Sequence, residues 1–340
     1  MTPVSTSVLT SNALELELKA TSALFLGGAD SSLRELDPEL RVSAFRGVLR
    51  FWLRALLGNQ GLDLGTLKHK EASILGGVSP QSGASEVQLR LRPSGQTGVF
   101  TAKRALLPHR AAAGQLGGQN PSKQALVEGT SFQLQMLPRL GFKHLPDEAI
   151  QTLLLMLHLG GLGNRSRRGF GSLQLVSVGQ SGLSLVSEHL QGFVQQAVIP
   201  QDGNALAGYL RNLLTLFAPK AGSTIPQYPV LDTSNAKVIV CKTPYSAGRH
   251  QHPYAQPMLA FWGELHSGSY AHQPEFGGIK PRQASPIILH LAQTEAGTHL
   301  VITAFRSFHG NWSLVQDFLN AFIGNTRYDA EQVYGDNGGW

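Results

Sequence analysis

Alternating and helical hydrophobic patterns divide the first half of the chain into short strands and amphipathic helices. Apolar and polar residues alternate strictly over Leu14–Ala20, which predicts a half-buried strand. The same alternation recurs in three later segments, around Val87–Leu91, Phe132–Met136 and Leu173–Leu175. Helical spacing predicts one helix from an N-cap at Ser43 to a stop at Gly58, and another that opens at Pro146.

The predicted order of these elements, β-α-β-β-α-β, is that of a ferredoxin-like unit, which is also the framework of RNA-binding RRM domains. In the second half, the patterns predict helices at Leu185–Val198, Leu206–Phe217, Met258–Leu265 and Leu314–Ile323 and strands at Lys237–Cys241, Pro286–Leu291 and Leu300–Phe305. From Lys237 onward the order is β-α-β-β-α, a second ferredoxin-like unit without an obvious last strand. We therefore predict an α+β fold of two ferredoxin-like (RRM-like) domains with insertions, over residues 1–180 and 181–340.

Two segments do not fit this alternation. Gly95–Ser122 is rich in Gly, Gln, Ala and Pro and is too long for an ordinary connection, which makes it either a functional insertion or disordered. The tail from Asn325 to Trp340 is mostly polar and is expected either to fray or to dock on a neighbour.

Composition narrows the class of protein. The 340 residues are 42% hydrophobic, and no apolar run is long enough to span a membrane. The first residues lack the basic start and apolar stretch of a signal peptide. Cys241 is the only cysteine, which excludes a disulfide framework and a multi-thiolate metal site. We expect a cytoplasmic protein without a cofactor or a metal.

Positive charge is concentrated in the first half. The whole chain has a net charge of +6, but residues 1–180 contain 19 Lys and Arg against 12 Asp and Glu. No acidic residue lies between Glu86 and Glu128, where several basic residues occur. This distribution indicates a binder of phosphate backbones, although a basic loop without a ligand would give the same count. The RNA-binding candidates from this segment are Lys103, Arg104 and Arg110.

The first predicted helix carries a basic stripe. Arg46, Arg50 and Arg54 are four residues apart and lie on one face, and nothing acidic on this helix neutralises them. Such a stripe, with Arg41 just before it, favours an anionic partner over the alternative of a solvated amphipathic face.

A glycine-rich loop, Gly160–Gly171, joins the second helix to the fourth strand. Glycines such as Gly161, Gly163 and Gly169 would let the backbone approach a phosphate, and three arginines would supply charge and bidentate donors. These arginines are Arg165, Arg167 and Arg168. Phe170 would either stack on a base or anchor the loop. The loop is neither a dinucleotide fingerprint nor a Walker loop, since it follows a helix and lacks the Gly-Lys-Ser/Thr ending.

Three of these motifs together resemble the RAMP superfamily of CRISPR-associated proteins, and in particular the first RAMP subunit of type III-B (Cmr) effector complexes. They are the Gly27-Gly-Ala-Asp30 turn, the Phe-Arg-Gly-Val-Leu-Arg-Phe-Trp-Leu-Arg helix at 45–54, and the glycine-rich loop. Arg282-Gln-Ala-Ser-Pro286 is similar to an Arg-x-Ala-Ser-Pro element of the second domain in that group.

The resemblance implies a non-catalytic RNA-binding subunit that acts in antiviral defence. Its partners would be the guide (CRISPR) RNA, whose 3′ part it helps to seat, the target RNA and other RAMP subunits.

An endoribonuclease that processes guide RNA or cuts target RNA is the alternative function. His69 and His109 lie beside basic residues and are candidate general acids or bases. Asp30 and Asp37 lie in the loop where related RAMP backbone subunits carry a metal-dependent aspartate, although Asp30 could equally cap a turn. Histidines such as His250 and His252 match no zinc spacing.

Overall fold

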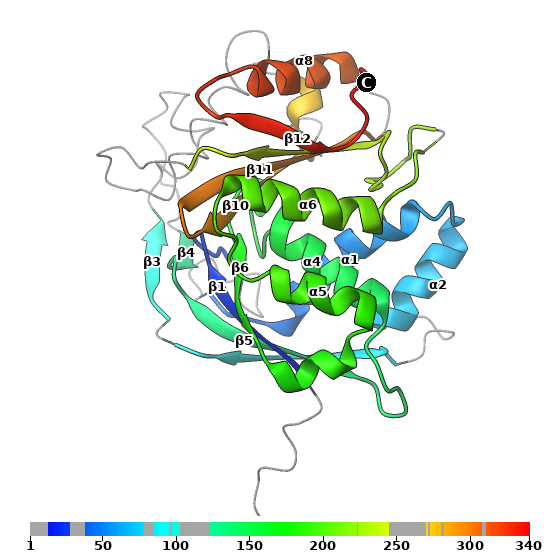
Figure 1. Cartoon of the computed structure of the whole chain (residues 1–340), viewed down its shortest axis with the longest axis vertical. Coiled ribbons are helices and arrows are strands. Elements are labelled where there is room, and N and C mark those ends of the chain that lie inside the picture. The colour runs from blue at the N-terminus through cyan, green and yellow to red at the C-terminus, as the bar shows by residue number, and fades with distance from the viewer. Residues whose placement is uncertain are drawn as a thin grey trace, which may run out of the picture.

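The computed structural model describes residues 13–27, 38–77, 84–95, 97–102, 123–222, 224–244, 270, 273–279, 282–307 and 311–340. It contains two four-stranded antiparallel sheets with helices packed between and outside them (Figure 1). This arrangement confirms the expected α+β class.

The first half builds a sheet with the strand order β2-β5-β1-β6. Its elements are β1 (Leu14–Ala20), α1 (Val42–Gly58), α2 (Leu64–Leu75), β2 (Val87–Pro93), β3 (Val99–Ala102), β4 (Lys123–Leu126), β5 (Ser131–Pro138), α4 (Asp147–Leu159) and β6 (Leu173–Val178). All four predicted strands and both predicted helices are present. Leu14, Leu16 and Leu18 of β1 are fully buried, while the residues between them point to the opposite face, as the alternation requires.

The ends of α1 differ from the prediction. Arg41 occupies the N-cap position without a side-chain cap, so Ser43 lies inside the helix and the predicted cap is wrong. Gly58 is the last helical residue rather than the residue beyond the end, and Asn59 follows it as the C-cap.

Helix α2 was not predicted. It begins after Asp63, whose side chain accepts hydrogen bonds from the backbone N–H groups of Gly65 and Thr66. Part of the long insertion is also ordered: β3 pairs with β4, and residues 103–122 lie outside the described residues.

The second half builds a sheet with the order β10-β11-β7-β12. Its elements are η3 (Gln180–Leu185), α5 (Glu188–Gln196), α6 (Gly203–Phe217), β7 (Ala236–Cys241), η6 (Pro274–Phe276), β8 (Gly278–Ile279), β9 (Arg282–Gln283), β10 (Ile287–Thr294), β11 (Gly297–Phe305), α8 (Trp312–Ile323) and β12 (Ala330–Tyr334). The single helix predicted over Leu185–Val198 is instead a 3₁₀ turn followed by α5. The helix predicted near Met258–Leu265 lies outside the described residues.

The sequence did not predict β12, the last strand of the second sheet, which lies inside the polar tail. The rest of the tail docks on its own chain, because the Lys237 Nζ donates hydrogen bonds to the carbonyl oxygens of Asp336 and Gly338 at 2.8 and 2.9 Å. The Trp340 ring packs edge-on against Trp312 with centroids 6.0 Å apart. Fraying, one of the two expected outcomes, is therefore wrong.

One hydrophobic core runs through both halves. It joins the inner face of the first sheet to helices α1, α4, α5 and α6, and continues to second-sheet residues such as Val238 and Val301. Helix α8 covers the other face of the second sheet (Figure 1). Burial on both faces explains why the Val238–Cys241 part of β7 is a continuous apolar run while β1 alternates. None of the described helices is both long and apolar enough to cross a membrane.

Candidate nucleic-acid interface

Three sequence motifs that are far apart along the chain meet at one junction. The backbone N–H of Asn164, in the glycine-rich loop, donates to the carbonyl oxygen of Phe25 at 2.8 Å. The Arg41 Nη2, at the start of α1, donates to the carbonyl oxygen of Gly27 at 2.9 Å. The segment Phe25–Gly27 is thus hydrogen-bonded both to the N-cap residue of α1 and to the loop.

The glycines of the loop are required by its packing. Gly163 has φ +85°, and a Cβ there would lie 2.6 Å from the carbonyl oxygen of Phe25. Gly171 has φ +72°, and its Cβ would overlap the carbonyl oxygen of Leu162. Folding alone therefore explains glycine at these two positions, and a phosphate contact by the loop backbone stays a prediction.

The Phe170 side chain is buried against Phe25. Its side chain is only 4% exposed, and its ring meets the Phe25 ring edge-on with centroids 5.1 Å apart. A base would need an open ring face. Of the two roles that the sequence left open, this packing favours the anchoring one, and an RNA contact by Phe170 stays a prediction.

The three loop arginines have different surroundings. Arg165 has a positive φ of 65°, and its guanidinium carbon lies 5.4 Å from the centroid of the Phe25 ring. The Arg167 Nη1 donates to the carbonyl oxygen of Ser285 at 2.7 Å, and its guanidinium carbon lies 5.2 Å from the Phe51 centroid. Burial lowers the pKa of both Arg167 and Arg168. Arg167 therefore fastens the loop to the second half, which makes it a poor candidate for a phosphate contact.

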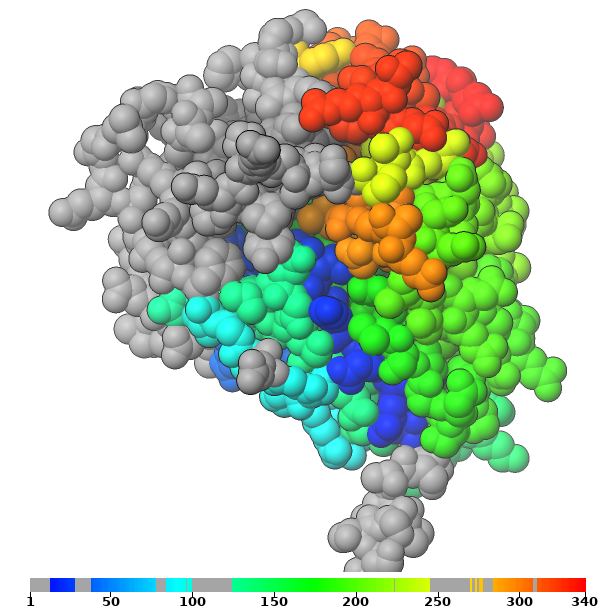
Figure 2. All heavy atoms as spheres, turned by 60° about the vertical axis from the view of Figure 1, so that its left-hand side comes forward, coloured from blue at the N-terminus to red at the C-terminus, as the bar shows by residue number. Residues whose placement is uncertain are grey.

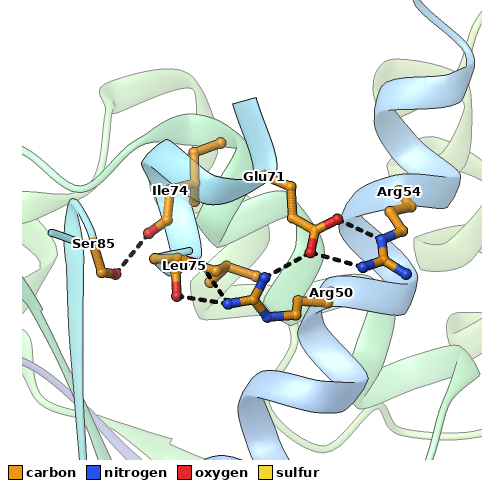
Figure 3. Close-up of polar contacts among 7 residues, drawn as sticks. Arg50, Arg54, Glu71, Ile74, Leu75 and Ser85 are labelled. Carbon is orange, nitrogen blue, oxygen red and sulfur yellow. Dashed lines mark hydrogen bonds and ion pairs between the residues drawn. The ribbon is translucent and has the colours of Figure 1, made fainter. Parts of the chain in front are cut away.

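The basic stripe of α1 is partly neutralised from α2. Glu71 lies between Arg50 and Arg54 and accepts hydrogen bonds from both (Figure 3). Burial raises the pKa of Glu71, but the hydrogen bonds from Arg54 and Arg50 outweigh this and leave it lowered. The hydrogen bond to Glu71 raises the pKa of Arg54. As expected, no acidic residue of α1 itself neutralises the stripe. In the folded protein, however, Glu71 of α2 neutralises part of it.

The outer face of the first sheet carries charges of both signs, because Arg90 and Arg92 of β2 lie on the same face as Glu15, Glu17 and Lys19 of β1. Glu15 and Glu17 lie on the central strand β1, where Glu15 accepts a hydrogen bond from Gln135 at 2.7 Å. In Figure 2 the blue atoms of this central strand reach the surface beside the teal atoms of β5, and the cyan atoms of β2 lie beyond them. Across the described strands this face presents no aromatic ring. The described strands of this face therefore lack the aromatic rings on which an RRM domain stacks bases.

Several of the other predicted residues lie in parts of the chain that the structure does not describe. Lys103, Arg104 and Arg110 lie outside the described residues, as do the alternative catalytic residues Asp30, Asp37 and His109. Arg46 is half-buried on α1, and His69 is exposed on α2. Over the described ranges, no group of three His, Cys, Asp or Glu side chains is arranged to hold a metal ion.

A buried histidine pair that the sequence did not predict lies at the contact between the two halves. His158 of α4 and His290 of β10 are both buried, and burial lowers their pKa values to about 3 and about 4. The His290 Nδ1 lies 2.6 Å from the carbonyl oxygen of Gly160. His158 sits inside the apolar run Leu153–Leu159, and this was the only signal in the sequence that it is buried.

Comparison with known proteins confirms the predicted resemblance. Residues 17–174 match the RAMP superfamily. The fold is similar to that of Cmr1 from Pyrococcus furiosus, with 19% identity, a TM-score of 0.62, and coverage of 95% of this chain and 99% of that one. It is also similar to a chain of the type III-B Cmr-beta complex bound to cognate target RNA, with 13% identity, a TM-score of 0.56 and coverage of 86% and 94%.

A second structure of the Cmr-beta complex, with target RNA, AMPPnP and single-stranded DNA, contains a chain at 12% identity and a TM-score of 0.55. That match covers 87% of this chain and 96% of the other. No curated protein sequence matches this one.

Proposed function

Because residues 17–174 match the RAMP superfamily, we propose that the chain is a non-catalytic RNA-binding subunit of a type III-B CRISPR effector complex. The meeting of the three motifs around Phe25–Gly27 carries this proposal. It gathers Arg41 and Arg165 from distant parts of the chain beside one backbone segment. The likeness to Cmr1 over almost the whole length of both chains supports it.

The proposed architecture is two ferredoxin-like units, over residues 1–180 and 181–340. Both sheets support this, since numbering the four strands of each sheet in chain order gives 4-1-3-2 across each sheet. In the second unit β12 supplies the fourth strand. The hydrophobic core that the two units share supports the proposal that they act as one body.

The proposed partners are the guide RNA, whose 3′ part the subunit would seat, the target RNA, and other RAMP subunits in the cytoplasm. Structures of similar chains within a complex bound to target RNA support the RNA and subunit partners. Phosphate contacts by arginines at the junction would provide the affinity, with no sequence information of their own.

Salt dependence of RNA binding tests the proposal. The logarithm of the affinity for a labelled single-stranded RNA should fall with the logarithm of salt concentration, with a slope of roughly −0.7 for each phosphate contact. Arg41→Ala should weaken binding and make the slope shallower by about one contact, whereas Arg327→Ala, on the second half, should change neither. Binding that does not respond to salt would contradict the proposed interface.

Target cleavage by the assembled complex tests the non-catalytic assignment. Alanine at Asp30, Asp37, His69 or His109 should leave the cleavage rate nearly unchanged. A large loss in any one of these variants, with assembly intact, would favour the endoribonuclease alternative.

A further inference from the structure

Arg54 is held along one edge of its guanidinium group. The Nε and Nη2 atoms both donate to Glu71, with Nη2 at 2.9 Å from Oε1 and Nε bonded to Oε2 (Figure 3). The Glu71 side chain is only 5% exposed, whereas that of Arg54 is 52% exposed. The carboxylate therefore lies on the protein side of Arg54, and the rest of the guanidinium group faces solvent.

A guanidinium group has five N–H donors arranged as forks, and a carboxylate on the Nε side leaves a second fork open. That fork consists of Nη1 and the outward hydrogen of Nη2. Within the described residues, the Arg54 Nη1 has no hydrogen-bond partner or ion pair. We propose that this outer fork is a bidentate phosphate contact for RNA and that Glu71 is the positioning residue that aims it, a proposal that rests on the RNA-binding function above.

Arg50 also binds Glu71, but it uses the rest of its guanidinium group within the protein. Its Nη1 donates to Glu71 at 2.7 Å, and its Nη2 donates to the carbonyl oxygens of Leu75 and Gly76, at the end of α2. These carbonyls lack partners within the helix, so Arg50 caps α2. Arg50 thus holds Glu71 ionised and α2 in place, and Arg54 presents the one net positive charge of the three groups.

This arrangement fits an anionic ligand of fixed shape better than simple solvation. An exposed arginine keeps many rotamers in water, and fixing one rotamer costs conformational entropy. Once Arg54 is fixed, its outer fork matches the two oxygens of a phosphodiester, which a lysine cannot engage in the same way. The competing explanation is that Glu71 only joins α1 to α2.

Arg54→Lys separates fork geometry from charge. The variant keeps the positive charge but loses the bidentate edge, so its affinity for a labelled single-stranded oligoribonucleotide should fall about tenfold at a temperature where the variant is folded. The loss of the paired hydrogen bonds to Glu71 should also lower its melting temperature. Arg211→Lys is the matched control, because Arg211 is similarly exposed at 47% and is also paired with a glutamate, Glu331. It should bind RNA as the wild type does. An Arg54→Lys variant with wild-type affinity would overturn the phosphate contact.

Glu71→Gln tests positioning by the sign of its effect. Removing a negative charge beside a basic stripe should strengthen RNA binding if charge alone matters, but should weaken it if Glu71 aims Arg54. Equal or tighter binding by a folded Glu71→Gln variant would overturn the positioning role. If this variant does not fold, Arg54→Lys still decides the proposal. A wild-type chain that binds no RNA at all contradicts the proposed function itself, which separates the two failures.

Discussion

The Arg167 guanidinium group and the Ser285 carbonyl oxygen, 118 positions apart in the chain, lie 2.7 Å apart. The backbone reinforces this link, since the N–H of Leu289 donates to the carbonyl oxygen of Arg167 at 3.0 Å. The glycine-rich loop, which the sequence predicts to bind phosphate, therefore also links the first half of the chain to β10 of the second half. Its arginines must be tested for stability as well as for RNA binding.

Arg167→Ala should destabilise the fold. The substitution removes a charge-assisted hydrogen bond and the packing on Phe51, and leaves the Ser285 carbonyl oxygen without this donor, for a loss of about 2 kcal/mol. Urea unfolding should show a lower midpoint. Arg92→Ala, at an exposed position on β2, should unfold as the wild type does, and an equal midpoint for both variants would remove the role of Arg167 as a link.

The sequence predicted those parts of the fold that depend on local pattern. Leu14–Ala20 alternates because only one face of its sheet is buried, so its register can be deduced without the structure. Helix α2 was not predicted because Gly65 lies in its first turn and the polar Glu71 interrupts its buried face. Asp63 is its N-cap. Strand β12, Ala-Glu-Gln-Val-Tyr, lies at a sheet edge and is too polar for its pattern to identify it.

The candidate site was predicted as a set of residue types but not as a geometry. Arg46, Arg50 and Arg54 were correctly placed on one helix, but Glu71 is 17 residues beyond Arg54 on an unpredicted helix. Phe170 was ambiguous because ring burial depends on Phe25, which is adjacent only after folding. Pairings between distant segments are set by tertiary packing, and a single sequence contains no periodic signal for them.

Two glycines should respond in opposite ways to alanine. Gly171→Ala forces an L-residue to φ +72° and into the Leu162 carbonyl group, so it should cost at least about 2 kcal/mol of unfolding free energy. Gly47→Ala lies in the middle of α1 with open space around it and should stabilise the fold by up to about 1 kcal/mol. Thermal unfolding of both variants gives the comparison, and a stable Gly171→Ala variant would show that the loop is not packed as described.

The C-terminal tail should contribute measurably to stability. Removing residues 335–340 leaves the buried ammonium group of Lys237 without the carbonyl oxygens of Asp336 and Gly338, which should cost about 1–3 kcal/mol. Lys237→Met in the same truncated chain should restore part of the loss, because it removes the unpaired charge. Truncation without any change in melting temperature would mean that the tail is not docked in solution.

Acid should destabilise the protein through His158 and His290. Both have folded-state pKa values, about 3 and about 4, below the ordinary value near 6.5 that they regain on unfolding. Between pH 6.5 and pH 4 the unfolded chain therefore binds more protons than the folded one, so stability is complete above pH 6.5 and falls as the pH drops. At 1.36 kcal/mol for each pKa unit, the loss by pH 4 is on the order of 3 kcal/mol for each histidine.

Urea midpoints measured across this range should fall less for His158→Phe, which keeps an aromatic ring on Tyr209, than for the wild type. His144→Phe, which removes an exposed histidine, is the control and should leave the wild-type pH dependence nearly unchanged. If His158→Phe and the wild type lose stability in parallel, groups other than this histidine govern the acid response.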